Sequence, residues 1–126
     1  MMLSMVVAVA IGAAVGAPLR YMTERVMAHR FGSTLPWGTF TVNIVGSAIL
    51  GVVLGMSVSR GLSEWWVTLL AVGFCGSLTT FSGFAAQVLE RTVPGGEAPS
   101  WRGAGYAAAS LLIGVLAAAA AYAVAS

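Results

Sequence analysis

The sequence predicts an all-α integral membrane protein with four transmembrane helices, the third of which is broken at its centre. The first observation is composition: 59% of the 126 residues are hydrophobic and 8% are charged, whereas a soluble domain carries roughly 25% charged residues. The second is that the apolar residues form four long runs. The third is a cluster of glycine and hydroxyl residues inside the third run. We therefore expect a single four-span membrane domain over residues 1–126, with approximate spans at residues 2–28, 37–59, 65–90 and 102–125.

The first run, residues 1–19, carries no charged side chain and is long enough to cross the hydrocarbon, which takes about 20 residues. A signal peptide would need a basic start and a cleavage site before a soluble domain. No Lys or Arg precedes this run, and more membrane follows it. Gly12 and Gly16 have the spacing of a close helix contact. Arg20 follows directly, and we expect it to have a structural role near a vestibule.

The second run begins at Pro36 and Trp37, which suit a first helical turn and a membrane interface. Thr39, Asn43 and Ser47 recur every four residues, so they share one face of the helix. Such a polar stripe either joins helices or lines a path. Three polar residues in register favour a path.

The third run begins with an aromatic pair, Trp65 and Trp66, and its centre at residues 73–84 holds three glycines, two serines and two threonines. Glycine weakens a helix, and hydroxyl groups offer the backbone other partners. Non-helical backbone at membrane depth is tolerated where it is buried in protein or lines a cavity. Interrupted membrane helices often build ion or substrate sites. A well-packed glycine-rich helix is the alternative.

Residues 93–100 contain two prolines and two glycines and predict a loop. The fourth run, residues 103–126, follows Trp101 and Arg102 and is uncharged. Much of this alanine-rich helix is expected to be packing surface, although Tyr106 and Ser110 share a face.

Three stretches, residues 12–21, 36–46 and 73–84, together resemble the Fluc/CrcB fluoride channel family. The third stretch is the most specific, with Gly-Phe-Cys-Gly followed by Leu-Thr-Thr-Phe-Ser and a second Phe. The match covers nearly the whole chain. It implies an antiparallel dimer of four-span subunits that lets fluoride leave the cell passively across the plasma membrane.

The resemblance also implies a structural sodium ion at the dimer centre, held by main-chain oxygens of Gly76 and Thr79. The implied fluoride pore is lined by uncharged side chains, namely Asn43, Phe81, Phe84, Thr39, Ser82 and Ser110. Amide and hydroxyl groups can replace the water donors of a small hydrated anion. Aromatic ring edges are electropositive and can face an anion without a formal charge.

The chain departs from the family pattern around these residues. Ser77 stands where a second glycine is usual, and Gln87 replaces a glutamate. Gly83 and Ala85 replace hydroxyl residues, so possible donors are lost on this subunit. We therefore expect that one pore of the dimer could be degraded.

Two other kinds of protein remain as alternatives. A small multidrug-type transporter is also four-span and dimeric, but it needs a membrane-embedded carboxylate, and the four runs contain none. A non-conducting subunit of a heterodimeric channel, or a scaffold, is the other alternative. An enzyme is not expected, because His29, Cys75 and the absence of Asp offer no nucleophile, base and orienting group together.

Charge distribution predicts the orientation of the chain in the membrane. With four spans, Arg60 lies on the side of the two termini, and five arginines lie on the other side: Arg20, Arg25, Arg30, Arg91 and Arg102. Short loops rich in arginine stay cytoplasmic, so the termini should be outside. A fixed orientation favours pairing with an oppositely oriented relative. The homodimer is the commoner family form and stays narrowly ahead.

Overall fold

The computed structural model describes residues 1–32, 35–92 and 101–126. Within these ranges the regular secondary structure is helical, and four segments are long and apolar enough to cross a membrane. The predicted all-helical fold and its four candidate spans are thereby confirmed for the described part of the chain. The loop predicted at residues 93–100 lies outside the described residues.

The first two spans are α1 (Met2–Phe31) and α2 (Trp37–Arg60). His29 and Arg30 lie in the last turn of α1, where positive charge suits the negative end of the helix dipole. Gly61 ends α2 in the left-handed conformation, with φ 62° and ψ 44°. A residue with a Cβ adopts this conformation only at a cost, which is why glycine is favoured at this position.

The third span consists of four short elements: α3 (Glu64–Val67), the π-helical segment η1 (Thr68–Cys75), α4 (Gly76–Leu78) and α5 (Phe81–Thr92). Thr79 and Thr80, between α4 and α5, lie outside regular helix. The span Glu64–Glu90 as a whole is bent by 24°. π-Helical turns and local breaks of this kind are frequent at functional sites.

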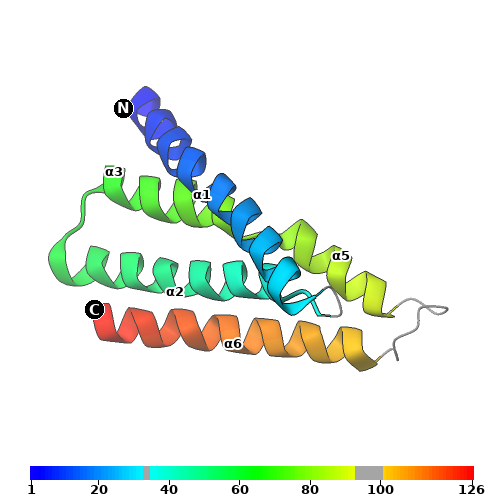
Figure 1. The fold of residues 1–126 in the computed structure, drawn as a ribbon. Coiled ribbons are helices and arrows are strands. Elements are labelled where there is room, and N and C mark those ends of the chain that lie inside the picture. Colours follow the sequence, from blue (N-terminus) through cyan, green and yellow to red (C-terminus); the bar gives the residue numbers. More distant parts are fainter. Residues whose placement is uncertain (33–34, 93–100) are drawn as a thin grey trace.

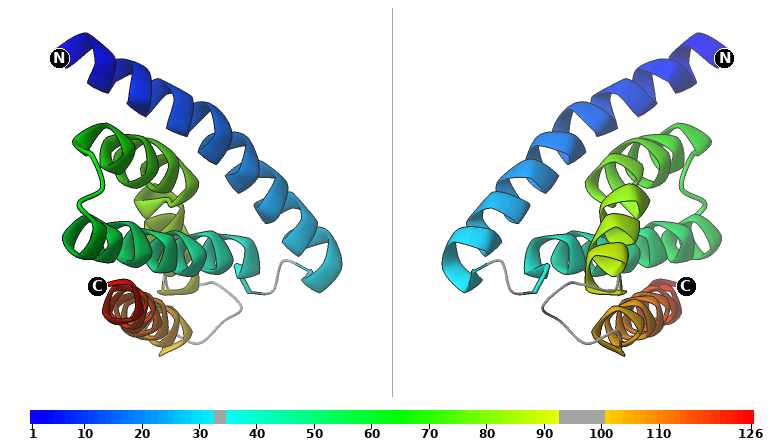
Figure 2. Two further views of the ribbon diagram at one scale, coloured as in Figure 1. Left: turned by 90° about the vertical axis from the view of Figure 1, so that its left-hand side faces the viewer. Right: turned by 90° about the vertical axis from the view of Figure 1, so that its right-hand side faces the viewer.

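The fourth span, α6 (Trp101–Ala125), lies beside α2, and the two helices run in the same direction (Figures 1 and 2). Small residues allow the close approach: a Cβ added at Gly55 would lie 2.8 Å from the Tyr122 carbonyl oxygen. Between the ends of these helices, the Ser59 hydroxyl donates to the Ala125 carbonyl oxygen at 2.7 Å. The pair therefore forms one wall of the subunit.

Helix α1 crosses the third span at an angle in Figure 1 and contacts it mainly along η1. At the crossing, a Cβ on Gly12 would lie 2.6 Å from the Phe74 nitrogen, and a Cβ on Gly73 would lie 2.7 Å from the Val9 carbonyl oxygen. Two glycines thus face each other where the backbones meet. The spacing of Gly12 and Gly16 has the close contact expected of it, since Gly16 approaches the Phe74 carbonyl oxygen in the same way.

The outer surface of the bundle is apolar. Large hydrophobic side chains such as Leu3, Val58 and Leu112 are 76%, 70% and 62% exposed. Few apolar side chains are buried within the single subunit, Val42 and Leu78 among them. An apolar surface of this extent suits contact with lipid and with other membrane helices.

Candidate functional site

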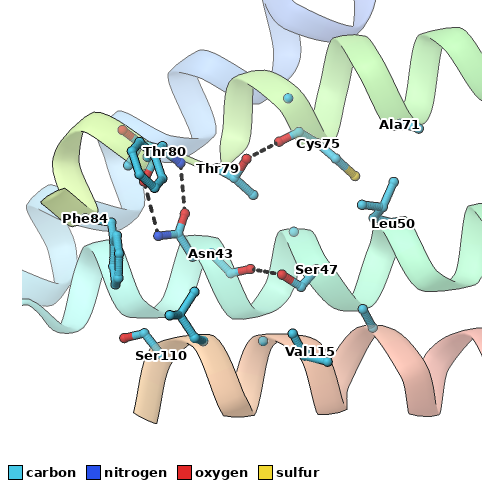
Figure 3. Close-up of a pocket in the computed structure, with 16 residues that line it drawn as sticks. Asn43, Ser47, Leu50, Ala71, Cys75, Thr79, Thr80, Phe84, Ser110 and Val115 are labelled. Atoms are coloured by element: carbon cyan, nitrogen blue, oxygen red, sulfur yellow. Dashed lines mark hydrogen bonds between the residues drawn. The ribbon is translucent and has the colours of Figure 1, made fainter. Parts of the chain in front are cut away.

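A cavity of about 420 Å³ lies between α2, the third span and α6, at the level where Thr79 and Thr80 interrupt regular helix (Figure 3). None of its lining side chains is charged. The lining residues are Asn43, Gly46, Ser47, Leu50, Ala71, Cys75, Gly76, Thr79, Thr80, Phe81, Phe84, Ser110, Leu111, Gly114, Val115 and Ala118.

The side chain of Asn43 joins α2 to the main chain of Thr80. Asn43 Oδ1 accepts a hydrogen bond from the Thr80 N–H at 2.8 Å, and Asn43 Nδ2 donates to the Thr80 carbonyl oxygen at 3.3 Å. Both bonds are drawn in Figure 3. An amide group is suited to this, because it offers one acceptor oxygen and two N–H donors. One N–H of Asn43 is then left for another acceptor.

Thr79 ends α4. Its backbone is extended, with φ −80° and ψ 160°. The Thr79 N–H and the Thr79 hydroxyl both donate to the Cys75 carbonyl oxygen, at 3.0 and 2.9 Å. A threonine hydroxyl that bonds back to the preceding turn competes with continued helix. The hydroxyl hydrogen of Thr79 is thus directed to the main chain and not to the cavity.

Thr80 begins the next helix. Its Oγ1 accepts a hydrogen bond from the Gly83 N–H at 3.1 Å, which is the contact that a threonine makes at the N-terminus of a helix. The Ser82 hydroxyl lies 3.3 Å from the same Oγ1. The Thr79-Thr80 pair therefore ends one helical segment and caps the next.

These contacts change the hydrogen bonding of two main-chain oxygens. In a continuous α-helix the Thr80 N–H would donate to the Gly76 carbonyl oxygen, but here it donates to Asn43. The Gly83 N–H would likewise donate to the Thr79 carbonyl oxygen, but it donates to Thr80 Oγ1. Both carbonyl oxygens are therefore available to other groups, and Gly76 is exposed on the subunit.

Arg20 uses one of these oxygens. Its guanidinium Nη1 donates to the Thr79 carbonyl oxygen at 3.4 Å, across 59 residues of sequence. The side chain is half-buried. This contact ties α1 to the irregular backbone of the third span, which agrees with the structural role expected for Arg20.

Two aromatic rings from α5 stand at the cavity. The ring centroids of Phe81 and Phe84 are 6.0 Å apart, and the Phe84 ring lies 5.7 Å from that of Tyr106 on α6. Phe81 is 80% exposed. A phenylalanine this exposed at the edge of a cavity has much of its surface free to contact another molecule.

The polar groups of α2 and α6 complete the lining. Ser47 donates from Oγ to the Asn43 carbonyl oxygen at 2.7 Å, so its hydrogen is used within α2. Ser110 on α6 is 8% exposed, and its buried Oγ has no hydrogen-bond partner among the described residues. Leaving a buried hydroxyl without a partner costs free energy. Ser110 is thus a polar group suited to a ligand or water.

Six of the eight residues predicted for the two ion sites line this one cavity: Asn43, Gly76, Thr79, Phe81, Phe84 and Ser110. Thr39 and Ser82 do not. Thr39 is 7% exposed within α2, one turn before Asn43, and Ser82 is exposed on α5.

Ser47 and Thr80 also line the cavity, although neither was predicted as a site residue. Ser47 belongs to the polar stripe of the second run and could have been found from its spacing. The sequence signal for Thr80 is weaker, since a threonine three residues before Gly83 is only one of several possible helix caps.

Comparison with known proteins adds an independent observation. A family model described as "CrcB-like protein, Camphor Resistance (CrcB)" matches residues 7–122. A protein of Nocardia farcinica (strain IFM 10152) is 41% identical over 109 residues, covering 86% of this chain and 69% of that protein. Its name is "Fluoride-specific ion channel FluC 1".

Two further relatives have the same name. One, from Streptomyces avermitilis, is 43% identical over 84 residues, covering 67% of this chain and 68% of the relative. The other, from Frankia casuarinae, is 43% identical over 83 residues, covering 62% of this chain and 64% of the relative. With four apolar helices and these relatives, the chain is a multi-pass membrane protein, and in bacteria such a protein lies in the plasma membrane.

Proposed function

Because this chain belongs to the CrcB-like family, we propose that it forms a fluoride-selective channel through which fluoride leaves the cell passively. The relatives named as fluoride-specific channels support the ion. The observation that carries the proposal is the cavity at Thr79 and Thr80, whose lining combines polar groups and aromatic rings with no charged side chain.

Fluoride is small and strongly hydrated, so a pathway for it must replace water donors with protein donors. The free N–H of Asn43 and the hydroxyl of Ser110 are the donors that the hydrogen bonding of the described residues leaves for an anion. Thr79 and Ser47 use their hydroxyl hydrogens on the main chain. Few donors without a full charge bind an anion weakly enough for rapid release, which conduction requires.

Phe81 and Phe84 provide the second element of the pathway. The edge of an aromatic ring is electropositive, whereas its face is electronegative. The tilt of 42° between the two rings presents different edges to the space between them. In the proposed mechanism these edges face fluoride while the apolar rings exclude larger hydrated ions.

The third span acts in this proposal as two half-helices that meet at Thr79 and Thr80. The support is the redirected hydrogen bonding at this point together with the bend of 24°. Asn43 holds the irregular backbone from outside the span, so its side chain both shapes the pathway and contributes a donor to it.

A sodium ion held by the main-chain oxygens of Gly76 and Thr79 is proposed as a structural component. The donor chemistry fits: sodium is a hard cation that prefers oxygen ligands, and neither carbonyl oxygen receives its regular helical donor. The Thr79 oxygen already accepts from the Arg20 guanidinium, and its second lone pair can face a metal ion. Bound sodium would supply a fixed positive charge that attracts anions.

An antiparallel dimer completes the proposed channel. It is supported by the exposure of Phe81 and Gly76, which a second subunit would cover. The count of five arginines against one on the two sides of the membrane favours one fixed orientation. Such a chain needs a relative of opposite orientation, whereas a homodimer needs the same chain in both orientations. The thinned set of hydroxyls at Gly83 and Ala85 fits a subunit whose partner supplies part of the pathway.

The experiment is ion release from liposomes that contain the purified protein with its partner subunit, if one is required. We expect fluoride to leave rapidly and chloride slowly. Equal rates for both ions would exclude a selective fluoride pathway. No release of either ion would favour a non-conducting subunit, and release that depends on a proton gradient would favour a small multidrug-type transporter.

A further inference from the structure

A second cavity, of about 630 Å³, lies between the N-terminal ends of α2 and α6, and we refer to it as the α2–α6 groove. Arg102 is the single charged residue among the described residues that line it. The remainder are apolar or aromatic, including Trp37, Phe40, Trp101, Ala109 and Ile113. No residue predicted for the ion pathway lines this groove.

The groove extends from the membrane interface into the hydrocarbon. Trp37 begins α2 and Trp101 begins α6, and tryptophan at helix starts is typical of the headgroup region. Both helices begin at the same end of the bundle in Figure 1. Ile113 follows Trp101 along α6, and the helical rise places it roughly 18 Å deeper. This depth corresponds to much of one acyl chain, since the hydrocarbon core is about 30 Å thick.

The charge at the mouth of the groove identifies the kind of headgroup. Arg102 is exposed, and its guanidinium carbon lies 5.9 Å from the centroid of the Trp101 ring. A guanidinium held beside a ring presents its planar N–H groups to a phosphate in two-point geometry. The end of the bundle that carries Arg102 also holds most of the arginines, which places it on the cytoplasmic side. Anionic phospholipids are concentrated in that leaflet.

We propose that the α2–α6 groove binds one anionic phospholipid. Its phosphate is bound by Arg102 at the level of Trp37 and Trp101, and one acyl chain lies along Phe40, Ala109 and Ile113. Basic pockets between membrane helices on the cytoplasmic side bind such headgroups in other proteins. The proposal does not depend on the ion that the channel carries.

Gly105 offers a direct way to fill the groove. It is one of the lining residues, and no atom lies within 4 Å of a Cβ built at this position. A larger side chain here projects into open space, and leucine favours helix more than glycine does. Gly105→Leu should therefore block the acyl chain without disturbing the helix.

The test is native mass spectrometry of the purified assembly with phosphatidylglycerol or phosphatidylcholine of identical acyl chains. We expect one phosphatidylglycerol per subunit at concentrations that retain no phosphatidylcholine. Arg102→Gln should weaken this binding about tenfold, because it removes a charge-assisted hydrogen bond. Arg30→Gln is the matched control: it removes another exposed arginine near the same end of the bundle but outside the groove.

Three outcomes would overturn the proposal. The first is equal retention of the two lipids, and the second is unchanged binding by Arg102→Gln. The third is a Gly105→Leu variant that still retains phosphatidylglycerol but loses its partner subunit, which would assign the groove to protein contact. The same spectra report the oligomeric state, so loss of lipid is distinguished from loss of assembly.

Discussion

The side-chain amide of Asn43 on α2 forms two hydrogen bonds with the main chain of Thr80 in the third span, one to the N–H at 2.8 Å and one to the carbonyl oxygen at 3.3 Å. No other side chain among the described residues is shown contacting both main-chain groups of one residue in another span. The irregular backbone of the third span is thus held by a residue 37 positions away in the sequence.

Replacing Asn43 by leucine should destabilise the protein by about 1–3 kcal/mol, because the main chain of Thr80 then loses both partners within the membrane. Thermal unfolding in detergent measures this loss. Ser47→Ala is the control, since the Ser47 hydroxyl bonds only to its own helix at 2.7 Å and should unfold nearly as the unmodified protein does. Equal stability of the two variants would show that the Asn43 contacts contribute little.

Phe81→Ile and Phe84→Ile should each slow fluoride release strongly while the protein still assembles. Isoleucine occupies similar space but has no electropositive ring edge. Phe31→Ile, at the end of α1 and outside the cavity, serves as the matched control. If both cavity variants release fluoride at the normal rate, the rings only pack.

Sodium should stabilise the assembled protein. A ligand that binds only the folded state at 100 times its dissociation constant contributes about 2.7 kcal/mol. We therefore expect a lower unfolding temperature when sodium is replaced by N-methyl-D-glucamine at equal ionic strength. A second bulky cation, choline, controls for general salt effects. An unfolding temperature that is the same in all three salts argues against a sodium site.

Gly12→Ala should destabilise the protein by about 1–3 kcal/mol, the usual cost of inserting a methylene where nothing can move. Its Cβ would lie 2.6 Å from the Phe74 nitrogen and 2.9 Å from the Gly73 carbonyl carbon, which are both main-chain atoms. Gly105→Ala makes the same chemical change in open space and should stabilise α6 by up to about 1 kcal/mol. Chemical denaturation in detergent distinguishes the two, and a loss at both positions would contradict the contact-based explanation.

A reporter on the C-terminus of the chain expressed alone should give a signal only outside the cytoplasm. The reason is the excess of arginine at the opposite end of the bundle. Reducing that excess with Arg25→Gln and Arg30→Gln should give mixed orientation. Equal signals inside and outside for the unmodified chain would reject a fixed orientation and favour the homodimer.

Much of the fold could be predicted from the sequence alone. Charge is so scarce, and apolar residues are so grouped, that four helices in lipid are the arrangement that satisfies the backbone. Glycine at positions 12 and 73 and the polar stripe of Thr39, Asn43 and Ser47 likewise indicate local properties, because helical periodicity fixes which residues share a face. The family follows from the motif at residues 73–84 for the same reason.

The partners of the polar groups were decided only by the tertiary structure. Spacing along one helix could not show that Asn43 contacts Thr80, that Arg20 reaches the Thr79 carbonyl oxygen, or that Thr79 uses its hydroxyl on Cys75. Nor could it place Thr39 and Ser82 outside the cavity that Phe84 and Ser110 share. Hydrogen bonds between spans depend on the angle and depth at which helices cross. The packing of the whole bundle sets both, and no single helix contains that information.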